Sequence, residues 1–77
     1  MATYQEYREL LVDLVKSIEA ENGLEEKHAV LILHKLNTVE KISEFGRWIA
    51  SKMKNDKLMA TETEICRAAV QISKKYS

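Results

Sequence analysis

The sequence predicts an all-α protein, a small antiparallel helical bundle of three long or four shorter helices. The chain has no proline and only two glycines among its 77 residues, which leaves little material for strands and tight turns. Apolar residues instead recur at steps of three and four in three segments, as in amphipathic helices. Capping signatures lie between these segments. Residues 1–77 are expected to form one domain, because a chain of this length builds a single core.

The first helix is expected over residues 3–21. Its apolar stripe consists of Tyr4, Tyr7, Leu11, Leu14 and Ile18. Gly23 is predicted to end this helix, because glycine adopts the left-handed conformation after a helix without a Cβ penalty. Asn22 and Glu25 have the spacing of a capping box for the next helix.

The middle segment, residues 24–54, allows two interpretations. Its apolar seam continues in steps of four and three through His28, Ile32, Lys35, Val39, Ile42, Gly46, Ile49 and Met53. A single helix of this length would span ~46 Å at 1.5 Å per residue, longer than a compact domain of this size, and a second copy would have to cover it. Alternatively, Asn37 and Glu40 cap a new helix, giving helices over 24–36 and 38–54. Both interpretations stay open, and an oligomer, dimeric or higher, is expected.

The last helix begins at a second capping box, Thr61 with Glu64. One face of it carries Ile65, Ala68, Ala69, Ile72 and Tyr76. Residues 54–57 are predicted to be the turn that leads into this helix. Lys74 and Lys75 lie near its C-terminus, where positive charge is favourable.

Charge and hydropathy narrow the setting in which the protein acts. Twelve basic and twelve acidic residues cancel, so no overall field draws the chain to nucleic acid or to an anionic membrane. Locally, residues 1–22 hold two basic and five acidic residues, whereas residues 47–57 hold four basic and one acidic residue. The longest apolar runs are far below the ~20 residues that span a bilayer, and the start lacks a secretory signal. We therefore expect a cytoplasmic protein that does not span a membrane.

The sequence offers no constellation for catalysis, metal binding or a cofactor. His28 and His34 are six residues apart, about 240° around a helix, so they cannot share a metal ion from one helix. Cys66 is the only cysteine, and nothing in the sequence places a base beside it. A helix-turn-helix made by the last two helices would present TETE, residues 61–64, and so its two carboxylates, to phosphates. Enzymatic activity, a metal site, a cofactor and nucleic-acid binding are therefore not expected.

A second face of the middle segment is the candidate binding site. On a continuous helix, six residues cluster on the side away from the main seam: Val30, His34, Lys41, Phe45, Trp48 and Lys52. Aromatic side chains beside basic ones are typical of partner hot spots and of surfaces that stack nucleotides. Three interpretations stay open: a surface for a protein partner or self-association, a nucleotide site at Lys41, Arg47, Trp48 and Lys52, or packing against the last helix with the lysine stems laid along it.

Residues 55–76, NDKLMATETEICRAAVQISKKY, resemble the final helix of the immunity proteins that protect producers of pediocin-like bacteriocins. Lys57 and Leu58 match that family's turn, and Thr61 matches its cap. The resemblance implies a cytoplasmic antiparallel bundle of four helices, without enzymatic activity, that protects a membrane receptor from a secreted peptide.

Together these observations predict a non-enzymatic binding or regulatory protein that acts by occupying a partner. An immunity or anti-defence protein is the named variant of this prediction. The alternative is an oligomeric protein that binds a small molecule or nucleotide on its aromatic and basic helix face.

Overall fold

A computed structural model describes residues 3–77 of the chain. These residues form the helices α1 (Tyr4–Asn22), α2 (Glu26–Lys35), α3 (Val39–Ser51) and α4 (Glu62–Lys75). A short antiparallel hairpin, β1 (Met53–Lys54) and β2 (Lys57–Leu58), joins α3 to α4. The prediction of an all-α helical bundle is confirmed, with the shorter helices rather than the three long ones. No helix in the described part of the chain is long and apolar enough to cross a membrane.

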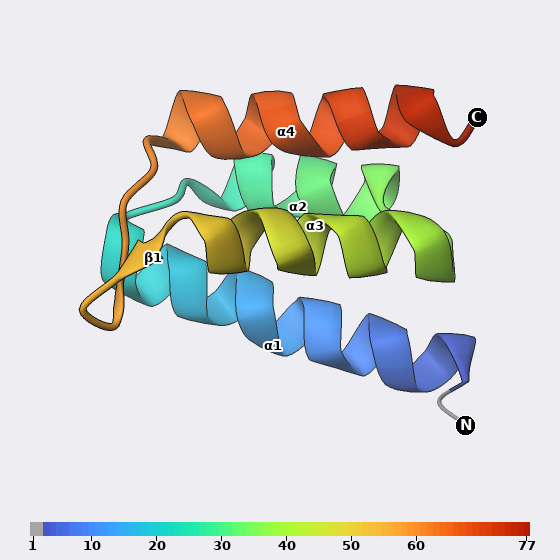
Figure 1. Cartoon of the computed structure of the whole chain (residues 1–77), viewed down its shortest axis with the longest axis horizontal. Helices are drawn as coiled ribbons and strands as arrows, with labels where there is room; N and C mark the ends of the chain where they lie inside the picture. The colour runs from blue at the N-terminus through green and yellow to red at the C-terminus, as the bar shows by residue number, and fades with distance from the viewer. Residues whose placement is uncertain (1–2) are drawn as a thin grey trace.

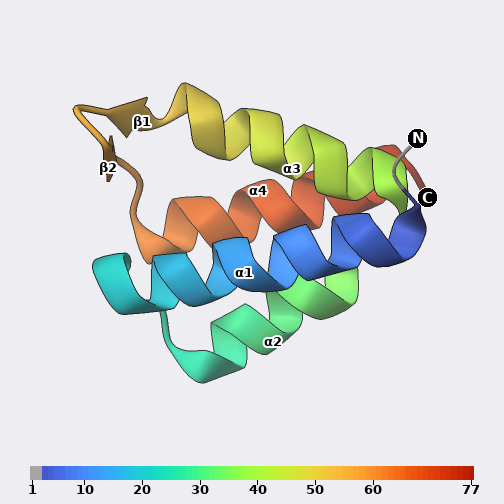
Figure 2. The ribbon, with the colours of Figure 1, turned by 90° about the horizontal axis from the view of Figure 1, so that it is seen from below.

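The helices surround one core. Within residues 3–77, α1 packs against α2 and α3, and α4 packs against the same pair from the opposite side (Figures 1 and 2). Consecutive helices run in opposite directions, so the N-termini of α2 and α4 lie at the same end of the bundle (Figure 1). The largest side chains at the centre are Leu11, Val15, Ile32, Leu36, Phe45 and Ile65.

The middle segment breaks, so the interpretation as one continuous helix is wrong. α2 ends at Lys35 and α3 begins at Val39. The cap of α3 is Thr38, whose side chain accepts a hydrogen bond from the backbone N–H of Lys41 over 3.3 Å. The predicted cap, Asn37, instead accepts a hydrogen bond from Lys41 Nζ over 3.0 Å.

Arg8 of α1 stabilises this break from outside the segment. Its guanidinium donates to the carbonyl oxygens of Leu33 over 2.7 Å and Leu36 over 3.0 Å. Carbonyls in the last turn of a helix have no partner within the helix, and a cation there complements the helix dipole. The periodic pattern in the sequence continues past this point. The helix nevertheless ends here, because Arg8 of α1 supplies hydrogen bonds to the carbonyl groups that the end of α2 leaves free.

The break also removes the reason to expect a second copy. The folded chain measures 29 × 24 × 21 Å, and α2 and α3 are covered by α1 and α4 of the same chain. Among residues 3–77, no helix protrudes from the bundle in a way that would need a partner subunit to cover it. The oligomeric state itself stays a prediction.

The predicted helix ends are mostly confirmed. Gly23 follows α1 with φ 70°, and Thr61 and Glu64 form the expected capping box of α4. The predicted box at the start of α2 is wrong, because Glu25 caps this helix without a side-chain hydrogen bond. Asn22 instead donates from Nδ2 to the carbonyl oxygen of Leu58 over 3.1 Å.

The hairpin before α4 was predicted only as a turn. Asn55 and Asp56 have φ of 52° and 62°, and positive φ at both central residues is typical of the type I′ turn that closes two-residue hairpins. Met53 is paired with Leu58 across the strands. The tight hairpin makes α3 and α4 antiparallel neighbours, which positions the candidate site.

Candidate functional site

The six residues predicted to form one binding face lie on two helices. Val30 and His34 are exposed on α2, whereas Lys41, Phe45 and Trp48 belong to α3 and Lys52 caps its C-terminus. The expectation of a single face is wrong, because the 100° periodicity was extended across a break in the helix. Whether any of these residues contacts a partner stays a prediction.

Burial separates the α3 residues further. Phe45 is 0% exposed and Lys41 is 7% exposed, so both belong to the interior and neither is available to a partner in this structure. Trp48 and Lys52 are half-buried. Of the predicted residues at α3, only Trp48 and Lys52 are therefore still accessible, and they lie along the edge of α3 that meets α4.

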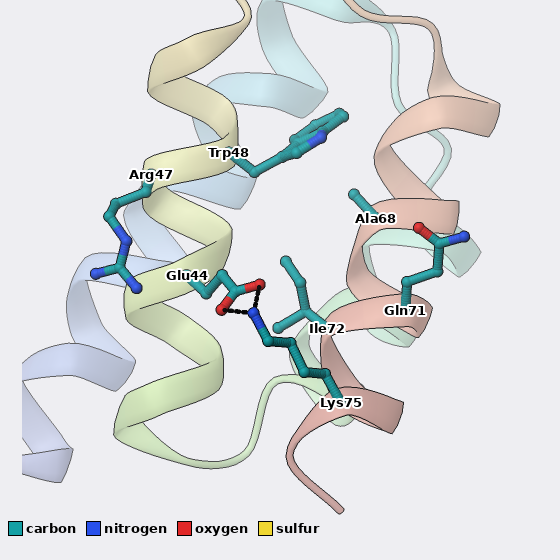
Figure 3. Close-up of a pocket in the computed structure, with 7 residues that line it drawn as sticks. All are labelled: Glu44, Arg47, Trp48, Ala68, Gln71, Ile72 and Lys75. Atoms are coloured by element: carbon teal, nitrogen blue, oxygen red, sulfur yellow. Dashed lines mark hydrogen bonds and ion pairs between the residues drawn. The ribbon is translucent and has the colours of Figure 1, made fainter.

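At this edge, α3 and α4 enclose a groove of about 460 Å³ (Figure 3). Its lining consists of Glu44, Arg47, Trp48, Ala68, Gln71, Ile72 and Lys75. The Trp48 ring extends across towards α4, and Ala68 and Ile72 point into the space between the helices (Figure 3). Ala68 and Ile72 are 7% and 5% exposed, so they form an apolar floor that is itself largely buried, and the half-buried Trp48 ring stands beside it.

Trp48 is supported by side chains of its own helix. Its ring is stacked on Phe45 with 6.2 Å between centroids and 19° between planes. The Nζ atom of Lys52 lies 5.7 Å from the Trp48 centroid, a cation–π distance. Because Phe45 is buried in the core, the Trp48 ring is stacked against a core side chain.

A smaller hollow of about 180 Å³ adjoins the groove towards the hairpin. It shares Trp48, Ala68 and Gln71 with the larger space, and its further lining residues are Lys52, Glu64 and Arg67. The two spaces form one groove, which we call the α3–α4 groove. It is apolar at its centre and charged towards the hairpin.

An ionic cluster closes the other end of the α3–α4 groove. The Glu44 carboxylate accepts hydrogen bonds from Lys75 Nζ at 3.0 and 3.1 Å and from the Tyr76 hydroxyl at 2.6 Å. The bond from Tyr76, followed by that from Lys75, lowers the pKa of Glu44. The same contacts with Glu44 raise the pKa values of Lys75 and Tyr76.

The remaining charges of the groove are unevenly matched. Glu64 accepts hydrogen bonds from the backbone N–H and hydroxyl of Thr61, which lower its pKa. Within residues 3–77, Arg47, Lys52 and Arg67 form no ion pair at N···O distances up to 4.0 Å. The Arg47 side chain points away from α4 (Figure 3). Lys52 and Arg67 therefore have no ion-pair partner among the described residues, but their charges also lower the pKa of Glu64, and Lys52 faces the Trp48 ring.

A second cluster lies where the N-termini of α2 and α4 meet. Glu25, His28 and Glu62 place one potential metal-ligand atom each within 4.8 Å of the others. However, Glu62 Oε2 already accepts the backbone N–H of Glu25 over 2.8 Å and pairs with His28 Nδ1. These bonds satisfy the start of α2, so we interpret the cluster as a helix cap. Helical spacing places Glu25 near His28, but only the tertiary fold adds Glu62.

The two remaining candidates for chemistry stay apart. His34 is exposed on α2 and is not part of the Glu25–His28–Glu62 cluster. Cys66 is half-buried, and burial together with the charge of Glu62 raises the pKa of its thiol. A raised pKa disfavours the thiolate that a nucleophilic cysteine requires.

Sequence reasoning missed the α4 wall of the groove. Ala68 and Ile72 were assigned to the buried face of the last helix, and Arg67 and Gln71 received no role. The short connection between the last two helices was the available signal, because it makes them antiparallel neighbours and brings Trp48 opposite Ala68.

Comparison with known protein families, curated protein sequences and solved structures found no match. The fold and the groove define the class of protein as an all-α helical bundle with an aromatic and cationic interhelical groove. The resemblance of residues 55–76 to bacteriocin immunity proteins stays a prediction.

Proposed function

We propose that the chain is a non-enzymatic protein-binding module and that the α3–α4 groove takes up a segment of its partner. The observation that carries this proposal is the placement of Trp48. A tryptophan stacked on the core residue Phe45 lines an open groove opposite Ala68. Tryptophan and arginine are enriched among the residues that dominate binding energy at protein interfaces.

The composition of the groove supports protein binding. The half-buried Trp48 ring offers apolar area for burial beside Ala68, and Lys52 and Arg67 lie next to it at the hairpin end. A groove between two helices is a common docking site for a third helix. Its carboxylates are already engaged, Glu44 by Lys75 and Tyr76 and Glu64 by Thr61.

Immunity or anti-defence activity is the named variant of this proposal. The segment that resembles the immunity proteins, residues 55–76, contains α4 and so supplies one wall of the groove. In this variant the protein blocks its partner by binding a segment of it in the groove, and binding itself is the activity.

The nucleotide-binding alternative is weaker in this structure. Lys41, one of its expected anion contacts, is buried and bonded to Asn37. The Trp48 ring already contacts Phe45 and Lys52. A thermal-shift screen of nucleotides tests this alternative, which predicts a rise in Tm that Trp48→Ala abolishes.

Affinity capture tests the proposed function. The bait is the wild-type chain, Trp48→Ala, Arg67→Glu or the matched control Lys16→Glu. Lys16 is exposed on α1, across the bundle from α4 (Figure 1), so its substitution makes the same charge change away from the groove. We expect a partner that the wild type and Lys16→Glu retain and both groove variants lose.

The same samples need a check of the fold and of the site. Circular dichroism should give the same helicity for all the baits. Trp48 is the only tryptophan of the chain, so its fluorescence reports on the groove and should change when the captured partner is added. Equal capture by all the baits, or an unchanged Trp48 emission, would refute the groove as the binding site.

A further inference from the structure

We infer that the occupant of the α3–α4 groove is an acidic amphipathic helix of a partner protein. This inference rests on the proposed function and adds the chemical class of the bound segment. It follows from the charges of the groove, from the hydrogen bonding of its walls and from the order of its apolar and charged parts.

At the hairpin end of the groove cations outnumber carboxylates, because Lys52 and Arg67 lie beside the single carboxylate of Glu64. Within the described residues, Lys52 and Arg67 have no carboxylate at ion-pair distance, whereas Glu44 is held by Lys75 and Tyr76. Glu64 is held by the backbone and hydroxyl of Thr61. An acidic occupant would gain charge-assisted hydrogen bonds to Lys52 and Arg67 without breaking an ion pair, and it would compete with Glu64 for these two charges. A basic occupant would meet like charges.

The walls of the groove favour a helical occupant. Both walls are helices, α3 with 13 residues and α4 with 14, whose inner backbone N–H and C=O groups are already bonded within each helix. An extended segment laid between them would find no backbone partner on either wall, so any of its own N–H and C=O groups buried there would stay unpaired, at a cost comparable to lost hydrogen bonds. A helix arrives with these groups already paired and offers only side chains.

The positions of the apolar floor and the charged end of the groove predict the sequence pattern of the bound helix. The apolar floor lies at Ala68 and Ile72, and Arg67 lies at the charged end. One helical turn on α4 covers ~5.4 Å along its axis. A partner helix therefore needs apolar side chains at successive turns on one face, and aspartate or glutamate about one turn from the apolar residue that meets Trp48.

Three synthetic peptides of about 18 residues, long enough for five helical turns, test this inference. The first is an amphipathic helix with a leucine stripe flanked by glutamates. The second replaces every glutamate by lysine. The third keeps the composition of the first but scrambles the stripe. Trp48 fluorescence and isothermal titration calorimetry measure their binding to the wild type, Arg67→Glu and Lys16→Glu.

We expect the acidic amphipathic peptide to bind the wild type and Lys16→Glu at least about tenfold more tightly than either other peptide. Arg67→Glu should weaken it by about tenfold or more, and should improve binding of the lysine peptide, because the sign of the nearest charge is reversed. Improved binding of the lysine peptide also shows that Arg67→Glu is folded.

Other results would overturn the inference. Equal or tighter binding of the lysine peptide to the wild type would refute an acidic occupant, and equal binding of the scrambled peptide would refute an amphipathic helix. Sedimentation that shows a wild-type dimer dissociated by Arg67→Glu would identify the occupant as a second copy. If no peptide binds while capture still depends on the groove, the acidic helix is refuted and the proposed function stands. Capture that does not depend on the groove refutes the proposed function itself.

Discussion

Glu62, the first residue of α4, accepts the backbone N–H of Glu25 at the start of α2 over 2.8 Å. α2 has no side-chain cap of its own, so a carboxylate from another helix takes this role. The position suits a negative charge, because the N-terminus of a helix carries partial positive charge. His28 Nδ1 of α2 is the second partner of the same carboxylate oxygen. The start of α2 therefore depends on tertiary structure.

The substitution Glu62→Ala should loosen the first turn of α2. We expect faster amide hydrogen exchange at Glu25 and in the first turn of α2, because the acceptor at the helix end is lost. Two-dimensional NMR of the exchanging protein measures this residue by residue. The control, Glu26→Ala, removes an exposed carboxylate of the same turn and should leave the Glu25 amide protected. Equal exchange in both variants would show that Glu62 is not the cap.

Arg8→Met should destabilise the corner between α2 and α3. The variant keeps an apolar stem but loses the two hydrogen bonds to the carbonyl oxygens of Leu33 and Leu36. Hydrogen bonds to charged groups contribute about 1.5–3 kcal/mol each, and both bonds come from one guanidinium nitrogen, so we expect the free energy of unfolding to fall by at least about 1.5 kcal/mol. Urea denaturation measures it. Lys16→Met, at an exposed position of the same helix, is the matched control and should change stability by less than about 0.5 kcal/mol.

Truncation of Phe45 should destabilise the fold far more than truncation of Val30, although the sequence predicts both residues to lie on one binding face. Phe45 is 0% exposed and Val30 is 59% exposed. Phe45→Ala should lower the free energy of unfolding by about 3–5 kcal/mol, because it empties a core site. Val30→Ala should change it by less than about 0.5 kcal/mol. Similar losses for the two variants in urea denaturation would contradict the placement of Phe45 in the core.

The ionic cluster around Glu44 should make stability depend on pH. Its hydrogen bonds from Tyr76 and Lys75 lower the pKa of Glu44 in the folded chain. A lowered pKa means that the carboxylate stabilises the fold fully above its ordinary pKa of about 4.3, and that this contribution is lost as the pH falls through the lowered value. Wild type should exceed Glu44→Gln in stability near neutral pH, and the difference should vanish in acid.

Thermal unfolding of both proteins between pH 7 and pH 2, at low salt, measures this difference. Glu9→Gln, which removes an exposed carboxylate on α1, serves as the control and should follow the wild type. A constant difference between wild type and Glu44→Gln across the whole range would contradict a role for the ionised carboxylate.

Local signals in the sequence were enough for the helices and several of their ends. Periodicity predicted α1 and α4, Gly23 predicted the end of α1, and Thr61 with Glu64 predicted the start of α4. These features depend on residues within one or two turns of each other. The type I′ hairpin at Asn55 and Asp56 is also local, but it was predicted only as a turn.

The binding face could not be derived in the same way. Its six residues were grouped by assuming that residues 24–54 form one helix, and a break of a few residues placed Val30 and Phe45 in different environments. The groove combines Trp48 of α3 with Ala68 and Ile72 of α4. Side chains so far apart in the sequence come together only when the helices pack, so periodicity within one segment could not group them.

The sequence by itself determined an all-α chain, because helical periodicity and capping boxes are written within short stretches. Only the tertiary structure decided between one middle helix and two. The apolar seam favoured continuity, whereas the bonds that satisfy the ends of α2 come from Arg8 in α1 and Glu62 in α4. Hydrogen-bond partners supplied by other helices are not encoded in the segment they stabilise, and this is why the break, and the groove that depends on it, appeared only in the folded chain.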